Sequence, residues 1–216
     1  MSDSPTLEAP TRAATAATKA VDVRERILEA ARARFERYGF NKTTMNEIAG
    51  DCAMSAANIY RYFPNKGEIV AEGARRWLGD SERALRDIAG RAALSPADRL
   101  RRMVAARLAR MADLVSRHPH LDELIAHVCQ QQPDLLADYT RRVRALIAGV
   151  LEDGARAGDF AFADADAAEA AAAIEAATAM FHHHAFVRQL ALEDLERDAE
   201  RVMALLLRGL AKGTGG

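Results

Sequence analysis

Residues 44–66 read TMNEIAGDCAMSAANIYRYFPNK, and this stretch predicts two short helices joined by a tight turn. Thr44 and Glu47 have the spacing of a capping box, in which each side chain bonds the backbone N–H of the other residue. Ser55 is a preferred residue at the start of the second helix. Pro64 ends that helix, because the residue before a proline is pushed out of helical geometry.

Each of these two helices has an apolar face and an opposite face of small or polar residues. Two such helices with a short turn form a helix-turn-helix, whose second helix enters the major groove of DNA. Asn58, Tyr60 and Arg61 can donate hydrogen bonds to bases or phosphates. The spacing alone also allows an ordinary helical hairpin with a solvated outer face. The apolar faces consist of Met45, Ile48, Ala49 and Cys52, and of Ile59 and Phe63.

The same stretch resembles the DNA-binding segment of the TetR family of bacterial repressors. The matching residues are Thr44, Met45, Ile48, Ala49, Ser55, Tyr60, Tyr62, Phe63 and Lys66. Cys52, Ala53 and Met54 depart from the family pattern. Ala53 stands at the turn glycine, where a positive φ costs more for alanine, so we expect a slightly shifted turn.

The outer face and the helix starts supply the predicted DNA contacts. We expect Asn58 and Tyr60 to contact bases or adjacent phosphates, and Thr44, Tyr62 and Lys66 to anchor the phosphate backbone. The full set of predicted DNA-binding residues is Thr43, Thr44, Ser55, Ala56, Ala57, Asn58, Tyr60, Arg61, Tyr62 and Lys66.

Composition favours a helical, cytoplasmic protein. The chain has 216 residues, of which half are hydrophobic, with few glycines and prolines. No window approaches 18 uninterrupted apolar residues, so we expect no transmembrane span and no membrane partner. The net charge is −1, but residues 1–66 carry ten Lys or Arg against eight Asp or Glu, which is +2. Cys52 and Cys129 are expected to be reduced, packed thiols.

We predict an all-α fold of about nine helices in three parts. Residues 1–20 are expected to be a disordered arm, 21–66 a three-helix helix-turn-helix DNA-binding domain, and 67–216 a helical domain for ligand binding and dimerisation. Helices are predicted over 22–38, twice within 44–63, and over 66–90, 95–117, 120–131, 133–158, 164–190 and 192–212.

Dimerisation is expected through roughly 164–212. Ten alanines lie between Ala165 and Ala179, and small residues let helices approach closely. The resemblance implies pairing through the last two long helices as a four-helix bundle. The alternative is that these faces pack only within one chain.

All six histidines lie in the second half of the chain. If the faces that carry them meet, imidazoles would form a polar spot in an apolar effector pocket. The residues that we predict for ligand binding are Trp77, Met103, Met111, His127, Phe181 and His184. Exposed histidines are also ordinary on helices, and we predict no cofactor and no metal site.

The leading interpretation is a repressor that binds a palindromic DNA operator as a homodimer and is released by a small-molecule effector. One alternative is a metal- or haem-sensing regulator that uses histidines of the second half. A helical metal-dependent enzyme is another, although the chain lacks H-E-x-x-H, G-x-S-x-G and phosphate-binding glycine motifs. The third is an architectural protein that binds DNA without a ligand.

Overall fold

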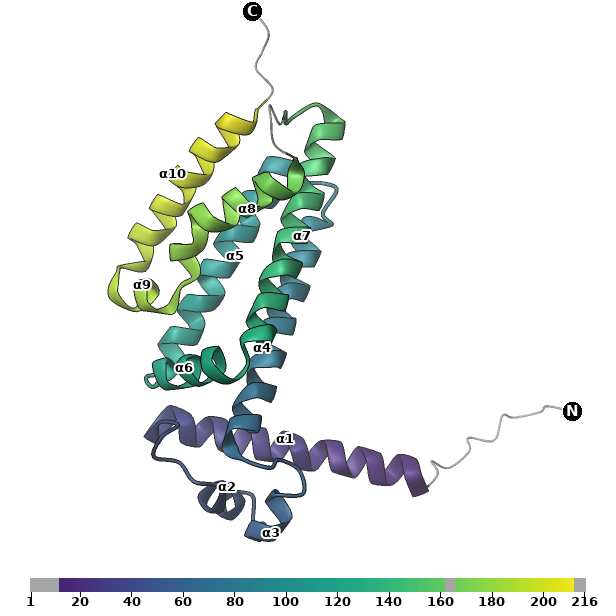
Figure 1. Ribbon diagram of the computed structural model, residues 1–216, viewed down its shortest axis with the longest axis vertical. Helices are drawn as coiled ribbons and strands as arrows, with labels where there is room; N and C mark the ends of the chain where they lie inside the picture. Colours follow the sequence, from purple (N-terminus) through teal and green to yellow (C-terminus); the bar gives the residue numbers. More distant parts are fainter. Residues whose placement is uncertain (1–11, 162–165, 212–216) are drawn as a thin grey trace, which may run out of the picture. The chain divides into compact units, whose positions relative to one another are not determined.

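The computed structural model describes residues 12–161 and 166–211, with side chains from residue 21 onward, and its regular elements in these ranges are helices (Figure 1). The predicted all-α class is therefore confirmed. The helices are α1 (Arg12–Tyr38), α2 (Met45–Asp51), α3 (Ala56–Ile59), α4 (Lys66–Ala89), α5 (Pro96–Arg117), α6 (Leu121–Gln131), α7 (Pro133–Ala157), α8 (Ala167–Thr178), the 3-10 helix η1 (Ala179–His182), α9 (His184–Gln189) and α10 (Leu192–Leu210).

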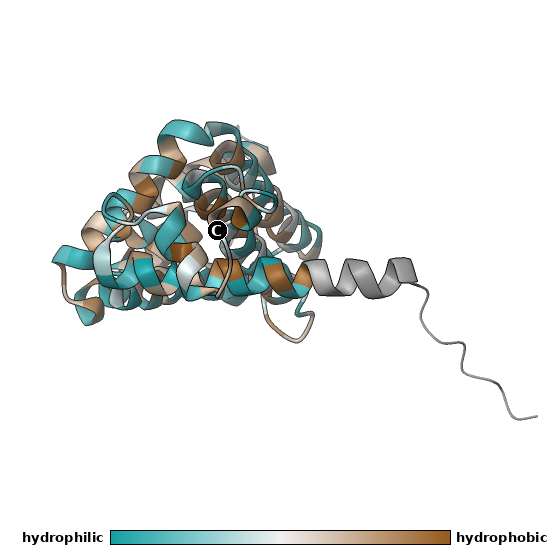
Figure 2. Ribbon diagram, turned by 90° about the horizontal axis from the view of Figure 1, so that it is seen from below, coloured by the Kyte–Doolittle hydropathy of each residue, from teal (hydrophilic) through white to brown (hydrophobic). Residues whose placement is uncertain are grey.

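The chain divides into two compact units, Met1–Val70 and Ala71–Gly216, which we call the N-terminal and C-terminal units. Helix α4 begins in the first and continues into the second. Along the ribbons of both, hydrophobic and hydrophilic residues alternate, as expected of helices that bury one face (Figure 2).

The N-terminal unit packs α1, α2 and α3 around a small apolar core. The apolar residues predicted on the two short helices are indeed buried, as are Ile27, Ala31 and Phe35 of α1. The predicted end of this helix at residue 38 is confirmed, and Gly39 follows it with φ +87° and an N–H bonded to the carbonyl of Phe35. A local signal in the sequence thus marks the end of α1.

Helix α1 begins at Arg12, ten residues before the predicted start at Asp22. The segment from Arg12 to Ala20, RAATAATKA, holds five alanines, which have the highest helix propensity. The predicted arm, 1–20, therefore overlaps this helix, and its residues 1–11 lie outside the described ranges.

In the C-terminal unit, α5 contacts α7 on one side and α10 on the other, and α7 packs along α8 (Figure 1). Buried residues of all four helices form one hydrophobic core. Gly158 ends α7 in left-handed geometry with φ +84°, as a C-terminal glycine does. Phe160 then folds back over Gly154, whose missing side chain leaves the room for its ring.

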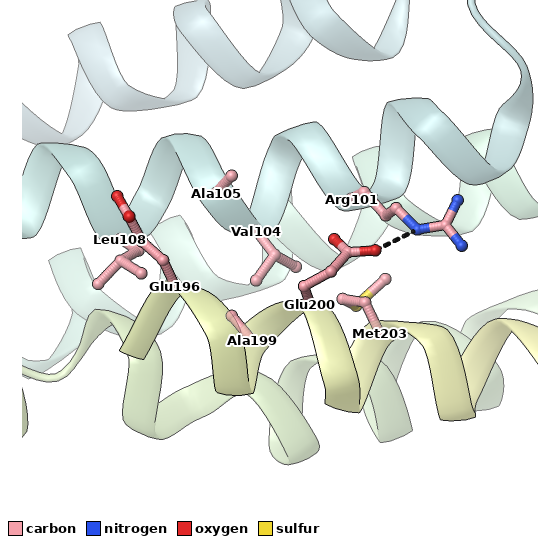
Figure 3. A pocket seen from close by; sticks show the side chains of 8 residues that line it. All are labelled: Arg101, Val104, Ala105, Leu108, Glu196, Ala199, Glu200 and Met203. Carbon is pink, nitrogen blue, oxygen red and sulfur yellow. Dashed lines mark ion pairs between the residues drawn. The ribbon is translucent and has the colours of Figure 1, made fainter. Parts of the chain in front are cut away.

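A small groove runs between α5 and α10 (Figure 3). Its floor is apolar, and the Nε atom of Arg101 lies 3.0 Å from a carboxylate oxygen of Glu200 at its rim. The groove is lined by Arg101, Val104, Ala105, Leu108, Glu196, Ala199, Glu200 and Met203.

The single helix predicted over 164–190 is wrong, because the structure breaks it into α8, η1 and α9. His183 is extended, with φ −91° and ψ 123°, and its Nδ1 accepts the N–H of Ala185 at the start of α9. No proline or glycine occurs at the break. Contacts distant in sequence hold it open, namely the burial of Phe181 and a bond from Arg107 to His182.

Candidate functional site

The turn between α2 and α3 has the geometry of a helix-turn-helix. Thr44 Oγ1 accepts the N–H of Glu47 at 3.3 Å, and the Glu47 carboxylate accepts the N–H of Thr44 at 2.8 Å. The predicted capping box is thus confirmed. Ser55 Oγ likewise accepts the N–H of Asn58 at the start of α3. Helix α3 is shorter than expected, because after Ile59 the chain continues as turns to Phe63.

Ala53 adopts a positive φ of +52°, where the family pattern has glycine. Left-handed geometry brings the Cβ atom close to the carbonyl oxygen that follows it, which costs about 1–2 kcal/mol. The bonds that flank Ala53 hold it there, since its N–H bonds Gly50 and the next N–H, of Met54, bonds Ala49. Sequence reasoning located this strained position correctly.

Most of the predicted DNA-binding residues lie at the surface of the N-terminal unit. Tyr60 is half exposed, at 50%, and Asn58 and Tyr62 are half-buried. The exposed residues of the set are Thr44, Ser55, Ala56, Ala57, Tyr60 and Arg61. The exposed side chains of the set are either small or carry hydroxyl or guanidinium donors.

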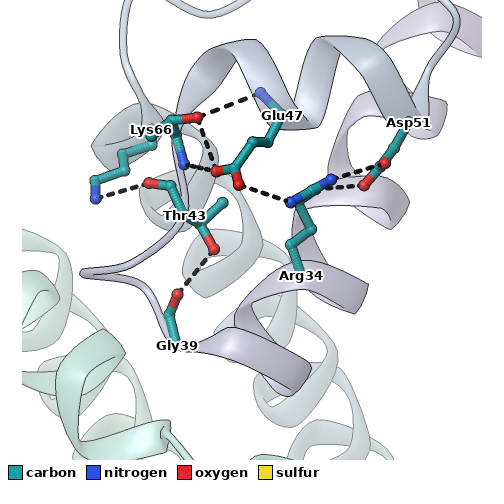
Figure 4. Close-up of polar contacts among 7 residues, drawn as sticks. Arg34, Gly39, Thr43, Glu47, Asp51 and Lys66 are labelled. Carbon is teal, nitrogen blue, oxygen red and sulfur yellow. Dashed lines mark hydrogen bonds and ion pairs between the residues drawn. The ribbon is translucent and has the colours of Figure 1, made fainter.

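Thr43 does not belong to that surface, and its DNA contact stays a prediction. The residue is only 1% exposed, and its hydroxyl donates to the carbonyl oxygen of Gly39 at 2.8 Å (Figure 4). Its position beside Thr44 suggested an exposed helix start, but the loop between α1 and α2 turns it inward.

Lys66 is also placed differently from the prediction (Figure 4). Its Nζ atom donates to the carbonyl oxygens of Phe40, Thr43 and Asn41 at 2.7, 3.0 and 3.3 Å. An ammonium group has three donors, and all three bond the chain itself. Lys66 thus clamps the loop before α2, and the phosphate anchor that we expected there stays a prediction.

Arg34 of α1 fixes the position of α2 (Figure 4). Its guanidinium donates to both carboxylate oxygens of Asp51, at 2.5 and 3.0 Å, and lies 3.3 Å from Glu47. The bond from Arg34 lowers the pKa of Asp51, and bonds from Thr44 lower the pKa of Glu47. Both carboxylates are therefore held ionised beside the arginine.

The residues predicted to bind a ligand do not meet at the groove in Figure 3. Met103 and Phe181 are buried in the packed core. Trp77, Met111 and His127 are half-buried. The Nε2 atom of His184 lies 3.5 Å from the carboxylate of Asp122 on α6.

The predictions from the sequence did not include a buried polar network that joins α5, α8 and η1. Arg107 and Glu175 are each 6% exposed and share two hydrogen bonds, at 2.5 and 2.9 Å. Arg107 also donates to His182 Nε2 at 2.8 Å. Two signals were available, because Arg107 interrupts the apolar stripe of α5 and Glu175 interrupts an alanine run.

Burial and the adjacent Arg107 lower the pKa of His182 to about 4, so this imidazole is neutral at pH 7. Arg107 also keeps the pKa of Glu175 below its ordinary value although burial opposes this. The network thus contains one buried ion pair and one neutral acceptor. Among the residues that the structure describes, no cluster of three His, Cys, Asp or Glu side chains could hold a metal ion.

Two family models match this chain. The model described as "Bacterial regulatory proteins, tetR family" matches residues 27–72, which include α2 and α3. The model described as "Tetracyclin repressor-like, C-terminal domain" matches residues 96–203. The second match alone covers half of the chain.

A curated relative from Escherichia coli K12, the probable acrEF/envCD operon repressor, is 29% identical over 125 residues. This match covers 56% of the chain and 54% of the relative, so the chain spans about half of that protein's length. In the part of the chain that the structure describes, no helix is long and apolar enough to cross a membrane.

Solved structures share the fold. SmeT, the repressor of the Stenotrophomonas maltophilia multidrug efflux pump SmeDEF, has a TM-score of 0.65 at 22% identity, covering 88% of this chain and 91% of its own. Thermus thermophilus FadR, solved with lauroyl-CoA, has a TM-score of 0.60 at 20% identity, covering 89% and 98%. With the matched models, the helix-turn-helix and the helical C-terminal unit, the chain belongs to the TetR family, whose members are DNA-binding transcriptional regulators and not enzymes.

Proposed function

We propose that this chain is a repressor that binds a palindromic operator as a homodimer and leaves it when a small molecule binds the C-terminal unit. The observation that carries the proposal is the exposed surface on and around α3. Small side chains at Ala56 and Ala57 allow close approach to base edges, and Tyr60 and Arg61 offer donors beside them. The E. coli relative is itself named a probable repressor.

The outer face of α8 supports pairing with a second copy. A surface helix normally carries charged residues on its exposed face. From residue 170 to 180, however, the only charged residue is Glu175, which is buried. The exposed or half-buried residues of this segment are Ala172, Ala173, Ala176 and Ala177 of α8 and Ala179 and Met180 of η1. On α10, Leu205 is 62% exposed.

Release by a ligand requires a compound that prefers the released conformation. Helix α4 gives such a compound a covalent route to the N-terminal unit, because it continues across the boundary between the units. The candidate contacts remain Trp77, Met103, Met111, His127, Phe181 and His184. Because Met103 and Phe181 are buried, the ligand must open the packed core to reach them.

Selection from random duplex DNA, followed by a release screen, tests this proposal. We expect enrichment of an inverted repeat whose half-sites lie one helical turn, or a multiple of it, apart. A library of small apolar compounds is then screened for loss of the fluorescence anisotropy of the bound operator. Failure to enrich any sequence would contradict operator binding, and tight binding that no compound reverses would favour an architectural role.

Dimerisation is tested by one substitution at two matched positions. Ala173→Glu places a charge on the exposed face of α8, and Ala126→Glu makes the same change at an exposed position of α6. Light scattering should show monomers for the first variant and dimers for the second. Dimers in both variants would exclude this face as the interface.

A further inference from the structure

Three connections join the helices of the N-terminal unit, and each is bonded by a cationic side chain. Carbonyl groups at helix ends and in loops lack helical partners and need other donors. Lys66 supplies them to the loop between α1 and α2, through its bonds to residues 40, 41 and 43. Arg26 donates to the Cys52 carbonyl after α2 at 2.7 Å, and Arg24 to the Tyr62 carbonyl after α3 at 2.9 Å.

Two of these cations also contact an aromatic ring. The Nζ atom of Lys66 lies 4.4 Å from the centre of the Phe40 ring. The guanidinium carbon of Arg24 lies 4.3 Å from the centre of the Phe63 ring. Lys66 and Arg24 are half-buried, whereas Arg26 is exposed. Turning Lys66 or Arg24 toward a phosphate would break the carbonyl bonds and the contact with the ring together.

Lys42 and Arg61 differ from these cations. Both are exposed, and within the described part of this unit neither side chain bonds a protein acceptor. Lys42 lies in the loop before α2, and Arg61 lies in the turn after α3, two residues past Ile59. Their charges are therefore available to the phosphate backbone of DNA at no cost to the fold.

We infer that the cations of this unit divide into two groups with separate roles in DNA binding. Arg24, Arg26 and Lys66 are positioning residues that hold the connections around α2 and α3. Lys42 and Arg61 are the phosphate contacts. This inference rests on the proposed operator binding, and it assigns Lys66 a role in sequence discrimination instead of charge neutralisation.

The two roles differ in how DNA affinity depends on salt. Each phosphate contact contributes about 0.9 to the slope of log affinity against log salt concentration. The slope is measured by fluorescence anisotropy on the operator that the wild-type chain selects. Arg61→Ala and Lys42→Ala should each lower the slope by about 0.9 for every copy of the chain bound.

Lys66→Met keeps the aliphatic stem and removes the donors. We expect an unchanged slope. The ratio of affinities for the operator and its single-base variants should fall about fivefold, since a loosened loop weakens the base contacts that discriminate between sequences. Lys66→Arg retains a cation with several donors and should restore the ratio. If Lys66 only stabilised the fold, a Lys66→Met variant that circular dichroism shows to be fully folded would keep the wild-type ratio.

A slope that falls by about 0.9 per chain in Lys66→Met would overturn the inference and make Lys66 a phosphate contact. An unchanged slope in both Arg61→Ala and Lys42→Ala would overturn the other half. If Lys66→Met does not fold, Arg24→Met provides the same measurement. If the wild-type chain enriches no operator, the proposed function fails, while slopes on random-sequence duplexes still separate the two groups of cations.

Discussion

Lys66 and Arg24 in the N-terminal unit and Arg107 in the C-terminal unit use their charges in different ways. In the N-terminal unit, Lys66 and Arg24 bond backbone carbonyls in the connections between short helices. In the C-terminal unit, buried Arg107 pairs with buried Glu175 side chain to side chain, and Arg99 bonds both the Asp153 carboxylate and the Ala89 carbonyl. Short helices leave many carbonyl groups that need donors, whereas long packed helices bury charges that need an opposite charge. Loss of Lys66 or Arg24 should therefore loosen a loop in the first unit, and loss of Arg107 should leave a buried carboxylate without its partner in the second.

Arg107→Met should have the largest effect on stability. The substitution leaves the Glu175 carboxylate buried without its partner, which lowers the free energy of unfolding by about 3–5 kcal/mol. Urea denaturation at pH 7 measures the loss. The double variant Arg107→Met with Glu175→Leu removes both charges and should recover most of it. A double variant no more stable than the single one would show that packing around Arg107, and not the stranded charge, matters.

Gly154→Ala should rank second. A Cβ atom at this position would lie 2.2 Å from the Phe160 ring, so the ring and the turn that carries it must move. We expect the free energy of unfolding to fall by about 2–3 kcal/mol. Gly149→Ala is the matched control on the same helix, because nothing lies within 4 Å of its Cβ position. The control should gain up to about 1 kcal/mol from helix propensity, and an equal loss in both variants would exclude the contact with Phe160.

The pH dependence of stability should follow from His182, which faces Arg107, Glu175, the Thr178 backbone and His183. Its folded-state pKa of about 4 lies below the ordinary value of 6.5. Between these values the unfolded chain binds a proton that the folded chain does not, so stability falls as the pH is lowered. From pH 7 to pH 5 the loss should be about 2 kcal/mol.

His182→Gln removes this titration and keeps an acceptor for Arg107. Its free energy of unfolding should change less over the same pH interval, as measured by urea denaturation. The interval stays above the ordinary pKa of Glu175, whose ion pair becomes weaker only at lower pH. A variant with the same pH dependence as the wild-type chain would place the titrating group elsewhere.

Ala53→Gly should have the smallest effect, and it is stabilising. Glycine adopts a φ of +52° without the Cβ clash, although it adds entropy to the unfolded chain. The net gain should be at most about 1 kcal/mol, visible as a small rise in the midpoint of thermal unfolding. Glycine at Ala57, in ordinary helical geometry, should lower the midpoint instead.

The sequence predicts the N-terminal unit in more detail than the C-terminal one. The capping box of Thr44 and Glu47, the cap at Ser55 and the strained Ala53 depend on neighbours within a few residues, so local patterns reveal them. The bonds of Lys66 span more than 20 residues, and the network of Arg107 and Glu175 spans 68. Such contacts depend on how helices pack, which periodicity does not determine.

The break after α8 shows the same limit. Alanine-rich sequence favours one continuous helix, but the buried Phe181 and the bonded His182 hold a different path. For the same reason the predicted ligand-binding set could not be placed. Helical periodicity gives the face on which Met103 or His127 lies, but it does not show which other faces meet it.

The most direct measurement compares the binding of the wild-type chain to a palindromic operator and to a duplex with one half-site. A dimeric repressor should bind the palindrome as two chains, by light scattering of the complex, and at least about 100-fold more tightly than the half-site at the same salt concentration. Equal affinity for both duplexes, with one chain bound to each, would contradict the account.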